Sequence, residues 1–220
     1  MNKEYCLNLI PGDGIGIEVI EECKKIISLI ADISGVVFRF KEFEWGCEYY
    51  LKTGKMMPDD GLKRLRDGDA ILLGAVGFPG VPGHISLREL LLPIRKEFDQ
   101  YVNLRPVKLL KGLKSPLDVD DEAKIDFVVV RENTEGEYCG RGSIEDEDTE
   151  NETVLQESVF TYKATDRIIR YAFELAEKKG KKKLCSATKS NALNYSMVFW
   201  DNVFDNVKKN TLTLNQLLCT

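Results

Sequence analysis

Two groups that could bind an anion and donate a proton lie close together in residues 128–138, which read VVVRENTEGEY. They are the guanidinium of Arg131 and the phenol of Tyr138. Three β-branched residues precede the arginine, and such a run is typical of a strand buried on both faces. Asn133 and Gly136 favour a turn directly after it. This stretch therefore predicts a binding site for a small anionic substrate at the end of a strand.

A second concentration of cationic side chains lies in residues 86–106, SLRELLLPIRKEFDQYVNLRP. Arg88 and Arg95 have the spacing i, i+7, so a continuous helix would place them on one face. Pro93 predicts a kink or a helix start between them, because its ring removes a helical hydrogen bond. Arg105 precedes a proline and is expected to be extended.

These arginines allow two interpretations. Arginines at helical spacing usually form a solvated basic face. Several arginines without obvious carboxylate partners nearby in the sequence favour instead a polyanionic ligand held by bidentate hydrogen bonds. The residues expected to converge on such a ligand are Arg88, Arg95, Arg105 and Arg131.

The segments that precede these residues alternate between strand and helix patterns. Residues 5–10, 36–43 and 69–74 predict strands, and apolar residues at helical spacing over 15–30 predict a helix between the first two. A short helix after Pro58 precedes the third strand. Strands separated by helices indicate parallel βαβ units, so the predicted fold class is α/β.

The first of these strands runs into a glycine loop, GDGIG at residues 12–16. Backbone amides at a helix N-terminus can bind an anion, so an acyl- or phosphoryl-transferring protein is one class that the loop allows. The G-x-G-x-G spacing departs from the dinucleotide fingerprint, and the lysine of a phosphate-binding loop is absent. The alternative is a tight strand-to-helix turn that uses the dihedral freedom of glycine.

The second half of the chain contains an acidic, glycine-broken segment, 139–162, which predicts either a hairpin arm reaching a partner subunit or a mobile loop. Thr165 or Asp166 is expected to cap an amphipathic helix with apolar residues over 168–176. Residues 183–187 predict a further strand, and the sequence TKSNALNYSMVFW after it leads into a last helix.

Composition argues against several function classes. The net charge of −5 is unlike that of a general nucleic-acid binder, and no apolar run approaches the roughly 18 residues of a membrane span. The start of the chain lacks a signal-peptide core, so a cytoplasmic location is expected. His84 is the single histidine, which nearly excludes histidine pairs or triads. The six cysteines contain no C-x-x-C pair and are expected to be reduced packing residues.

Four stretches together resemble the β-decarboxylating dehydrogenases, the family of isocitrate, 3-isopropylmalate, homoisocitrate and tartrate/D-malate dehydrogenases. They are PGDGIGIE, LLPIRKEFDQYVNLRP, VVVRENTEGEY and ATKSN, in the family's order across residues 5–207, and their wording is most similar to the tartrate/D-malate branch. The resemblance implies an isopropylmalate-dehydrogenase-like two-domain fold. Residues 1–100 would form the first part of its larger domain, and 101–220 the smaller domain, with a dimer clasp around 139–162.

The resemblance also implies a reaction, in which NAD oxidises a 2-hydroxy diacid and Mg²⁺ or Mn²⁺ assists its decarboxylation. Tyr138 would donate a proton to the enol carbon, and Lys189 would act as a base in the site of the neighbouring subunit. Asn191 would lie near the nicotinamide. The carboxylates of the diacid would be held by Arg95, Arg105 and Arg131, while Arg88 would contact the variable part of the substrate.

The resemblance fades after about Val207, and no Asp or Glu follows Asp205. The family's metal-binding aspartates and adenosine-binding loops would lie beyond this point. We therefore expect no metal ligand in this chain, a C-terminally incomplete fold, and an exposed sheet edge with apolar surface. We expect the chain to be a truncated copy of such a dehydrogenase, with little activity. The alternative is a non-catalytic diacid-binding or subunit-interaction protein.

Overall fold

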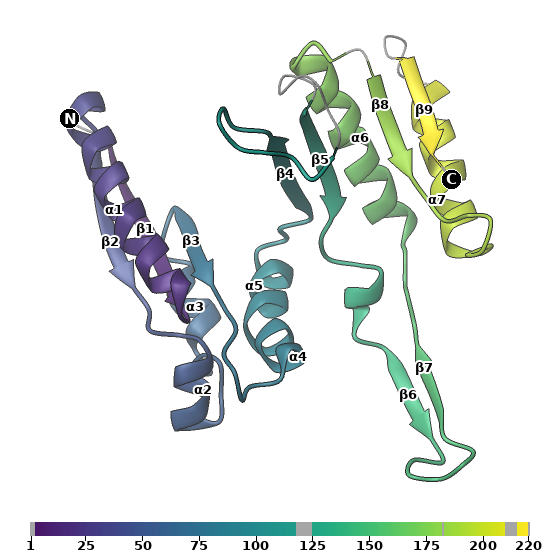
Figure 1. Ribbon diagram of the computed structural model, residues 1–220, viewed down its shortest axis with the longest axis horizontal. Helices are drawn as coiled ribbons and strands as arrows, with labels where there is room; N and C mark the ends of the chain where they lie inside the picture. Colours follow the sequence, from purple (N-terminus) through teal and green to yellow (C-terminus); the bar gives the residue numbers. More distant parts are fainter. Residues whose placement is uncertain (1–2, 118–124, 182, 210–214, 220) are drawn as a thin grey trace. The chain divides into compact units, whose positions relative to one another are not determined.

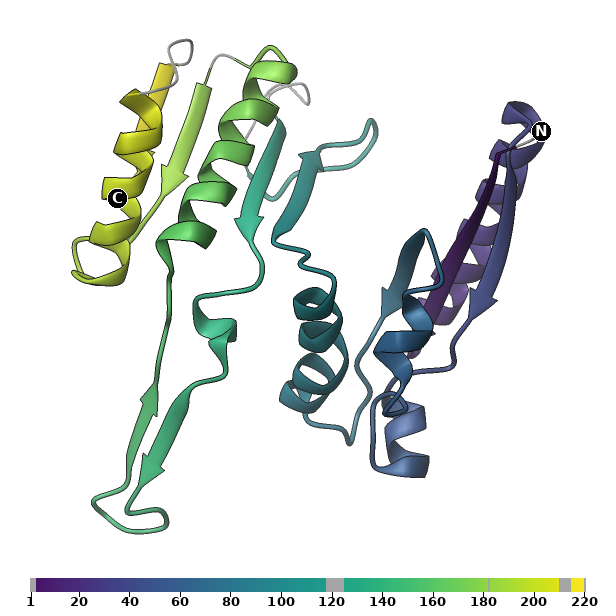
Figure 2. The same ribbon diagram turned by 180° about the vertical axis from the view of Figure 1, so that it is seen from behind.

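The computed structural model describes residues 3–117, 125–181, 183–209 and, for the backbone alone, 215–219. The chain divides into two compact units, Met1–Phe98 and Asp99–Thr220, called unit 1 and unit 2 below. Figures 1 and 2 show the elements of each unit from opposite sides. The assignment of a larger and a smaller domain stays a prediction.

Unit 1 is built on a three-stranded sheet in the order β2-β1-β3. In chain order its first elements are β1 (Glu4–Gly12), α1 (Ile15–Ser34), β2 (Val37–Glu42), α2 (Cys47–Thr53), α3 (Gly61–Leu65) and β3 (Ala70–Ala75). Both strand pairs are parallel, which confirms the predicted βαβ units. Helix α2 was not predicted, because its seven residues are too few to give a periodic apolar signal.

The segment after β3 carries Arg88 and Arg95 and is helical throughout. It consists of α4 (Gly83–Ser86), the π turn η1 (Leu87–Leu91) and α5 (Leu92–Glu97). The N–H of Leu92 donates to the carbonyl of Leu87, and this wider turn leads into Pro93, which has no N–H of its own to donate. A helix starts beside Pro93, as predicted, but the residues before it are helical as well.

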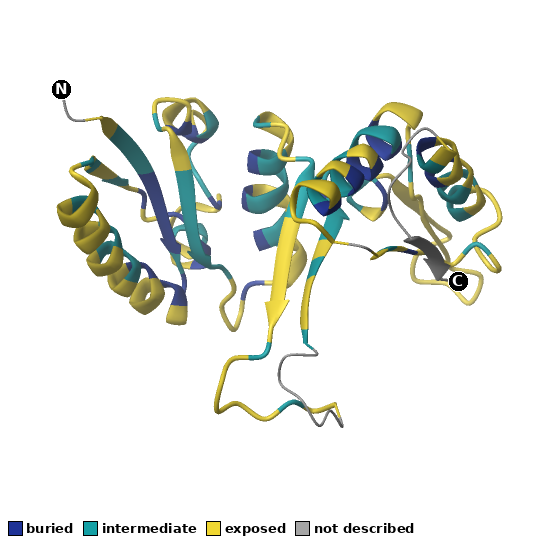
Figure 3. Cartoon of the chain, turned by 90° about the horizontal axis from the view of Figure 1, so that it is seen from above, coloured by how far each residue is buried: buried dark blue, intermediate teal, exposed yellow. Residues whose placement is uncertain are grey.

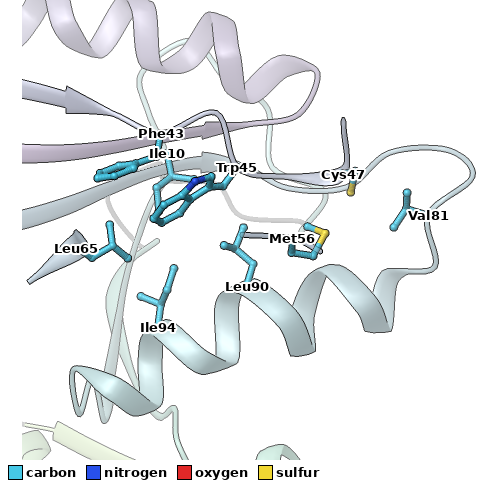
Figure 4. Packing of buried hydrophobic residues seen from close by; sticks show 9 residues of the cluster. All are labelled: Ile10, Phe43, Trp45, Cys47, Met56, Leu65, Val81, Leu90 and Ile94. Atoms are coloured by element: carbon cyan, nitrogen blue, oxygen red, sulfur yellow. The ribbon is translucent and has the colours of Figure 1, made fainter. Parts of the chain in front are cut away.

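The core of unit 1 forms where this helical segment packs against the sheet and the loops around α2 (Figure 4). The rings of Phe43 and Trp45 lie 4.4 Å apart at its centre. Leu90 and Ile94, one helical turn apart, contribute the apolar face of the helical segment. The buried residues of this core are Ile10, Phe43, Trp45, Cys47, Met56, Leu65, Val81, Leu90 and Ile94.

Helix α1 buries only Gly16 and Ile20, and most of its length is coloured as exposed in Figure 3. Most of its apolar side chains are therefore exposed. The exposed ones are Ile15, Ile17, Val19, Ile26, Leu29, Ile30 and Ile33. An apolar groove of about 520 Å³ lies between α1 and Leu72 of β3. Strand β3 has a single strand neighbour in the described part of the chain. The expected sheet edge and apolar surface are therefore present.

Although α1 has 20 residues, no described helix is long and apolar enough to cross a membrane.

Unit 2 pairs β4 (Val102–Lys108) with β5 (Asp126–Glu132) and β8 (Lys183–Ala187) with β9 (Asn215–Cys219). The first pair is antiparallel and the second parallel. Helices α6 (Tyr162–Lys178) and α7 (Ser196–Lys209) pack on each other through a core of Ile168, Ile169, Phe173, Val203, Phe204 and Val207. The strand predicted at 183–187 is confirmed.

Helix α6 begins earlier than the sequence predicted. Its N-cap is Thr161, whose hydroxyl accepts the N–H of Ala164 at 3.2 Å. The prediction of Thr165 or Asp166 as the cap is wrong, because both residues lie inside the helix and Thr165 is buried.

The acidic segment contains a hairpin of β6 (Gly142–Glu145) and β7 (Thr153–Gln156), preceded by the short 3₁₀ turn η3 (Glu137–Cys139). Both views show this hairpin extending away from α6 (Figures 1 and 2). Its apolar residues Ile144, Val154 and Leu155 are 52%, 63% and 51% exposed. The predicted hairpin is confirmed, while its role as a dimer clasp stays a prediction.

Four cysteines are free thiols, as expected: Cys6, Cys23, Cys47 and Cys139. Cys185 is disulfide-bonded, so the expectation of reduced thiols is wrong for this residue. The residue is exposed on β8 and not packed in the core. An exposed thiol can react with a second thiol, whereas a buried one cannot.

Candidate functional site

Arg105 and Arg131 lie on one face of the β4–β5 pair. In this antiparallel pair Asn103 is opposite Arg131, and Arg105 is opposite Val129. Opposite residues share a face, and residues two apart in one strand share it too. The alternate residues of the two strands, which include Val102 and Val130, pack against the α6–α7 core. The two arginines therefore project from the side of the strands that α6 does not cover. We call Asn103, Arg105 and Arg131 the arginine face.

The prediction that β5 is buried on both faces is wrong. Val129 is 42% exposed, whereas Val130 is partly buried against the core. The run of β-branched residues suits either environment, because a strand covered by helices on one face alone also accepts such side chains. The strand that carries Arg131 thus keeps one open face, on which a ligand could bind.

Arg131 and Tyr138 contact each other directly. The Nη2 group of Arg131 donates to the phenol oxygen of Tyr138, and its guanidinium carbon lies 5.0 Å from the centre of the ring. Since the arginine occupies a lone pair of the phenol oxygen, the phenol hydrogen remains available to another acceptor. Among the residues that the structure describes, neither Arg105 nor Arg131 forms an ion pair. Two cations without carboxylate partners on one face are suited to an anionic ligand.

The turn between Arg131 and Tyr138 is held by its own acidic side chains. The carboxylate of Glu132 accepts the N–H and hydroxyl of Thr134 at 2.9 and 2.6 Å and the N–H of Glu135 at 2.7 Å. The carboxylate of Glu135 accepts the N–H and hydroxyl of Thr161, the cap of α6, at 2.7 and 2.8 Å. Both glutamates are therefore engaged in fixing the turn.

Arg167 of α6 also holds this turn, a role that was not predicted from the sequence. Its Nη1 group donates to Asp99 at 2.8 Å, and its Nη2 group lies 3.5 Å from the hydroxyl of Thr134. The guanidinium carbon lies 4.2 Å from the centre of the Tyr101 ring, within the range of a cation–π contact. The residues it joins lie 68 and 33 positions away in the chain, so no local spacing could reveal the cluster.

Arg88 and Arg95 belong to unit 1, whereas Arg105, Arg131 and Tyr138 belong to unit 2. Arg88 is exposed on the π turn, and Arg95 is half-buried in α5. The π turn closes with an i→i+5 hydrogen bond, so the i, i+7 spacing no longer implies the shared face of a regular α-helix. The structure brings together Arg105, Arg131 and Tyr138 of the predicted site.

Lys189 and Asn191 lie in the turn that follows β8. The carbonyl of Lys189 accepts the N–H groups of Ala192 and Leu193 at 3.0 and 2.9 Å. Both predicted side chains are exposed. The backbone of this turn is thus fixed while the two side chains remain accessible.

The glycine loop, residues 12–16, is tightly packed and is held by hydrogen bonds of Asp13. A Cβ atom on Gly16 would lie 2.3 Å from the carbonyl oxygen of Pro11 and 2.4 Å from the nitrogen of Ala75, so only glycine fits there. The buried carboxylate of Asp13 accepts N–H groups of Cys47 at 2.8 Å and Gly77 at 3.0 Å. These contacts support the interpretation of a tight structural turn.

The ionisation of Asp13 follows from these contacts. Burial alone would raise the pKa of its carboxyl group, but the N–H donors of Gly77 and Cys47 outweigh this and hold the pKa below its ordinary value. Burial and the neighbouring Asp13 carboxylate raise the pKa of the Cys47 thiol to about 11. Asp13 is therefore a fixed negative charge that ties two loops together.

The described residues offer no metal site. No group of three or more His, Cys, Asp or Glu side chains that could hold an ion occurs among them. The donor set that Mg²⁺ or Mn²⁺ prefers, several carboxylate or carbonyl oxygens around one point, is therefore not supplied by this part of the chain.

Comparison with known proteins identifies relatives over nearly the whole chain. The sequence profile of the isocitrate/isopropylmalate dehydrogenase family matches residues 6–219. The tartrate dehydrogenase/decarboxylase of Pseudomonas putida is 54% identical over 87% of this chain, and the decarboxylating D-malate dehydrogenase of Escherichia coli K12 is 54% identical over 91% of it. The crystal structure of isocitrate dehydrogenase from Methylococcus capsulatus superposes with a TM-score of 0.82, at 27% identity over 97% of this chain.

The matched region is only part of each relative. The chain covers 53% and 56% of the two dehydrogenases from Pseudomonas putida and Escherichia coli. It covers 60% of the Methylococcus capsulatus structure. The chain thus spans about half the length of the curated relatives that it matches, and its α/β fold matches part of a larger fold.

Proposed function

The chain belongs to the isocitrate/isopropylmalate dehydrogenase family, and from this premise we propose that the whole protein oxidises and decarboxylates a 2-hydroxy diacid. The proposed substrate is of the tartrate/D-malate or isopropylmalate type, with NAD as the hydride acceptor. A cytoplasmic location is part of the proposal. The names of the two relatives at 54% identity, a tartrate and a D-malate dehydrogenase, support the first substrate type.

The arginine face is the observation that supports substrate binding by this chain. Arg105 and Arg131 share one face of β4–β5 and lack ion pairs within the described residues. Guanidinium groups bind carboxylates through paired hydrogen bonds, so two of them suit a dicarboxylate. Tyr138 is held at Arg131, and its free O–H is the proposed proton donor to the carbon that loses carbon dioxide. Arg88 and Arg95 of unit 1 are proposed as further substrate-binding residues.

The cofactors are proposed for the whole protein. NAD would accept the hydride and a divalent metal would polarise the resulting carbonyl. Asn191 is proposed to lie near the nicotinamide. The glycine loop does not fit a dinucleotide cradle, because Gly16 is already packed on Pro11 and Ala75. The described residues do not fit a metal site either. Mg²⁺ or Mn²⁺ therefore forms no part of the chemistry proposed for this chain alone.

A homodimer is the proposed assembly. The exposed apolar side chains of the β6–β7 hairpin, Ile144 and Val154 among them, suit a contact with a second copy. Lys189, accessible on a fixed turn, is proposed as the base toward the C2 hydroxyl in the site of the partner subunit.

Calorimetric titration of the 220-residue chain with D-malate and with tartrate tests the binding role. We expect binding of a diacid that weakens about tenfold or more in Arg131→Gln, because a hydrogen-bonded charge contributes roughly 1.5–3 kcal/mol. The matched control is Arg39→Gln, an exposed arginine paired with Glu4 in unit 1. Equal affinities for Arg131→Gln and the unmodified chain would contradict the assignment.

A second function class is a diacid-binding protein without turnover. It is favoured by the arginine face, because guanidinium groups bind carboxylates through hydrogen bonds without the help of a metal. An assay of NAD reduction with each diacid and Mn²⁺ separates the two classes. Turnover by this chain supports a dehydrogenase complete in itself, and diacid binding without turnover supports the second class.

A further inference from the structure

Two side chains, those of Asn103 and Asn133, connect Arg105 to the buried part of the turn. The Nε group of Arg105 donates to Oδ1 of Asn103 at 3.2 Å, and Nδ2 of Asn103 donates to Oδ1 of Asn133 at 3.2 Å. Nδ2 of Asn133 donates in turn to the carbonyl of Gln100 at 3.0 Å. The hydrogen bonds thus run in one direction, from a guanidinium through two amides to the backbone.

The direction of these hydrogen bonds is determined by Asn133, the buried residue among them. Asn133 is 5% exposed, and its backbone N–H donates to the carbonyl of Tyr101 at 3.1 Å. Because the carbonyl of Gln100 can only accept, Asn133 must turn its NH₂ group toward it and its oxygen toward Asn103. Asn103 must then present its NH₂ group to Asn133, which leaves its own oxygen for Arg105. Each amide is therefore held in one of its two orientations.

Occupation of Nε limits how Arg105 can bind a carboxylate. A guanidinium offers two edges for paired hydrogen bonds, one formed by Nε and one terminal nitrogen, the other by the two terminal nitrogens. Asn103 takes the Nε–H and so removes the first edge. The second edge remains, and no described residue forms an ion pair with it.

We propose that Asn103 and Asn133 are positioning residues that orient Arg105, so that it binds one carboxylate of the substrate through its two terminal nitrogens. The inference rests on the proposed function, in which Arg105 binds a diacid. Neither asparagine touches the substrate in this arrangement. Asn133 acts through Asn103, and Asn103 acts through Arg105.

The orientation itself is measured by NMR on the ¹⁵N-arginine-labelled chain. The exchange rate of the Arg105 Nε–H with water is compared with that of Arg88, an exposed arginine without an ion pair among the described residues. The Arg105 signal is assigned from an Arg105→Lys spectrum. We expect exchange at Arg105 to be about three- to tenfold slower than at Arg88, the protection of one net hydrogen bond.

Two variants and one control test whether these hydrogen bonds orient Arg105. Asn103→Ala should raise the exchange rate at Arg105 to that of Arg88, and Asn133→Ala should raise it part of the way. Both should weaken diacid binding in calorimetry about three- to tenfold. The control is Asn202→Ala, an exposed asparagine on α7, which should change neither quantity. Asn103 is only half-buried, so its variant stays informative even if Asn133→Ala fails to fold.

The outcomes separate this inference from the proposed function. Unchanged exchange at Arg105 in Asn103→Ala overturns the inference, whatever the chain binds. Faster exchange with unaltered diacid affinity overturns it too, because the amides would then serve the fold alone. If no diacid binds to the unmodified chain, the proposed function fails, and the exchange rate still decides whether the amides hold Arg105. Faster exchange together with weaker binding supports the inference.

Discussion

Replacing Asp13 by asparagine should destabilise unit 1 strongly at neutral pH and much less in acid. The carboxylate accepts backbone N–H groups of Cys47 at 2.8 Å, Gly77 at 3.0 Å and Glu48 at 3.3 Å. Hydrogen bonds to a charged group contribute roughly 1.5–3 kcal/mol each, and an asparagine retains one accepting oxygen while turning an NH₂ group toward another donor. The expected loss at pH 7 is therefore about 2–4 kcal/mol in the free energy of unfolding.

The pH dependence has a definite sign. The folded pKa of Asp13 is lowered, so its contribution is fully present above the unfolded pKa, about 3.9, and disappears as the pH falls through the folded value. The difference in stability between the unmodified chain and Asp13→Asn should thus be constant from pH 7 to about pH 5 and shrink below about pH 4.

Urea unfolding followed by tryptophan fluorescence provides the measurement. The chain has two tryptophans, and a Trp200→Phe background leaves Trp45, which is 4% exposed in the core of unit 1, as the only reporter. Asp32→Asn, an exposed residue of α1, is the control with the same change of charge. The reasoning is refuted if Asp13→Asn loses less than about 1 kcal/mol at pH 7, or if its deficit persists unchanged to pH 3.

Four further predictions concern other features. Gly16→Ala should cost about 3 kcal/mol or more in the same unfolding assay, because its Cβ would lie 2.3 Å from the carbonyl of Pro11; a neutral effect contradicts the packing described. Thr161→Ala should lower the stability of unit 2 by about 1 kcal/mol, because α6 loses its N-cap. Hydrogen exchange of the amides in the first turn of α6 measures this loss. Unaltered protection of these amides would be evidence against the cap. Ile33→Lys should change the free energy of unfolding by less than about 0.5 kcal/mol, because Ile33 is 79% exposed. The same substitution should reduce the binding of a hydrophobic dye to the chain. A large loss of stability would mean that α1 is covered in solution. Val154→Lys should convert the expected dimer to a monomer in sedimentation, and an unchanged mass excludes the hairpin as the contact.

The order of the elements in unit 1 was predictable from local patterns. Apolar runs bounded by glycine and proline located β1 and β3 within a few residues, because strands and their turns leave a short-range signal in the sequence. The start of α6 was misplaced because its first turn, from Tyr162, is mostly polar and the apolar period begins only at Ile168. The cap is fixed instead by Glu135, which lies 26 residues earlier in the chain.

The candidate site was predictable in its residue types and only partly in its arrangement. Arg131 and Tyr138 were found because they lie near each other in the sequence, and they do contact each other. Arg105 joins them through the register of β4 with β5, which no spacing within one strand could give. Arg167 and Asn133 were missed as organising residues, because their partners lie 68 and 33 positions away.

The turn from Glu132 to Gly136 has a consequence for how such chains diverge. Its side chains bind the cap of α6, the end of β4 and one another, and Gly136 adopts a φ of 70° where a Cβ would meet Phe160. Selection for nothing more than a folded unit 2 would therefore preserve the sequence ENTEG. A descendant that had lost turnover would still carry it, so this motif is a marker of ancestry and shape. Evidence that such a descendant still works as an enzyme must come from side chains that the fold does not need.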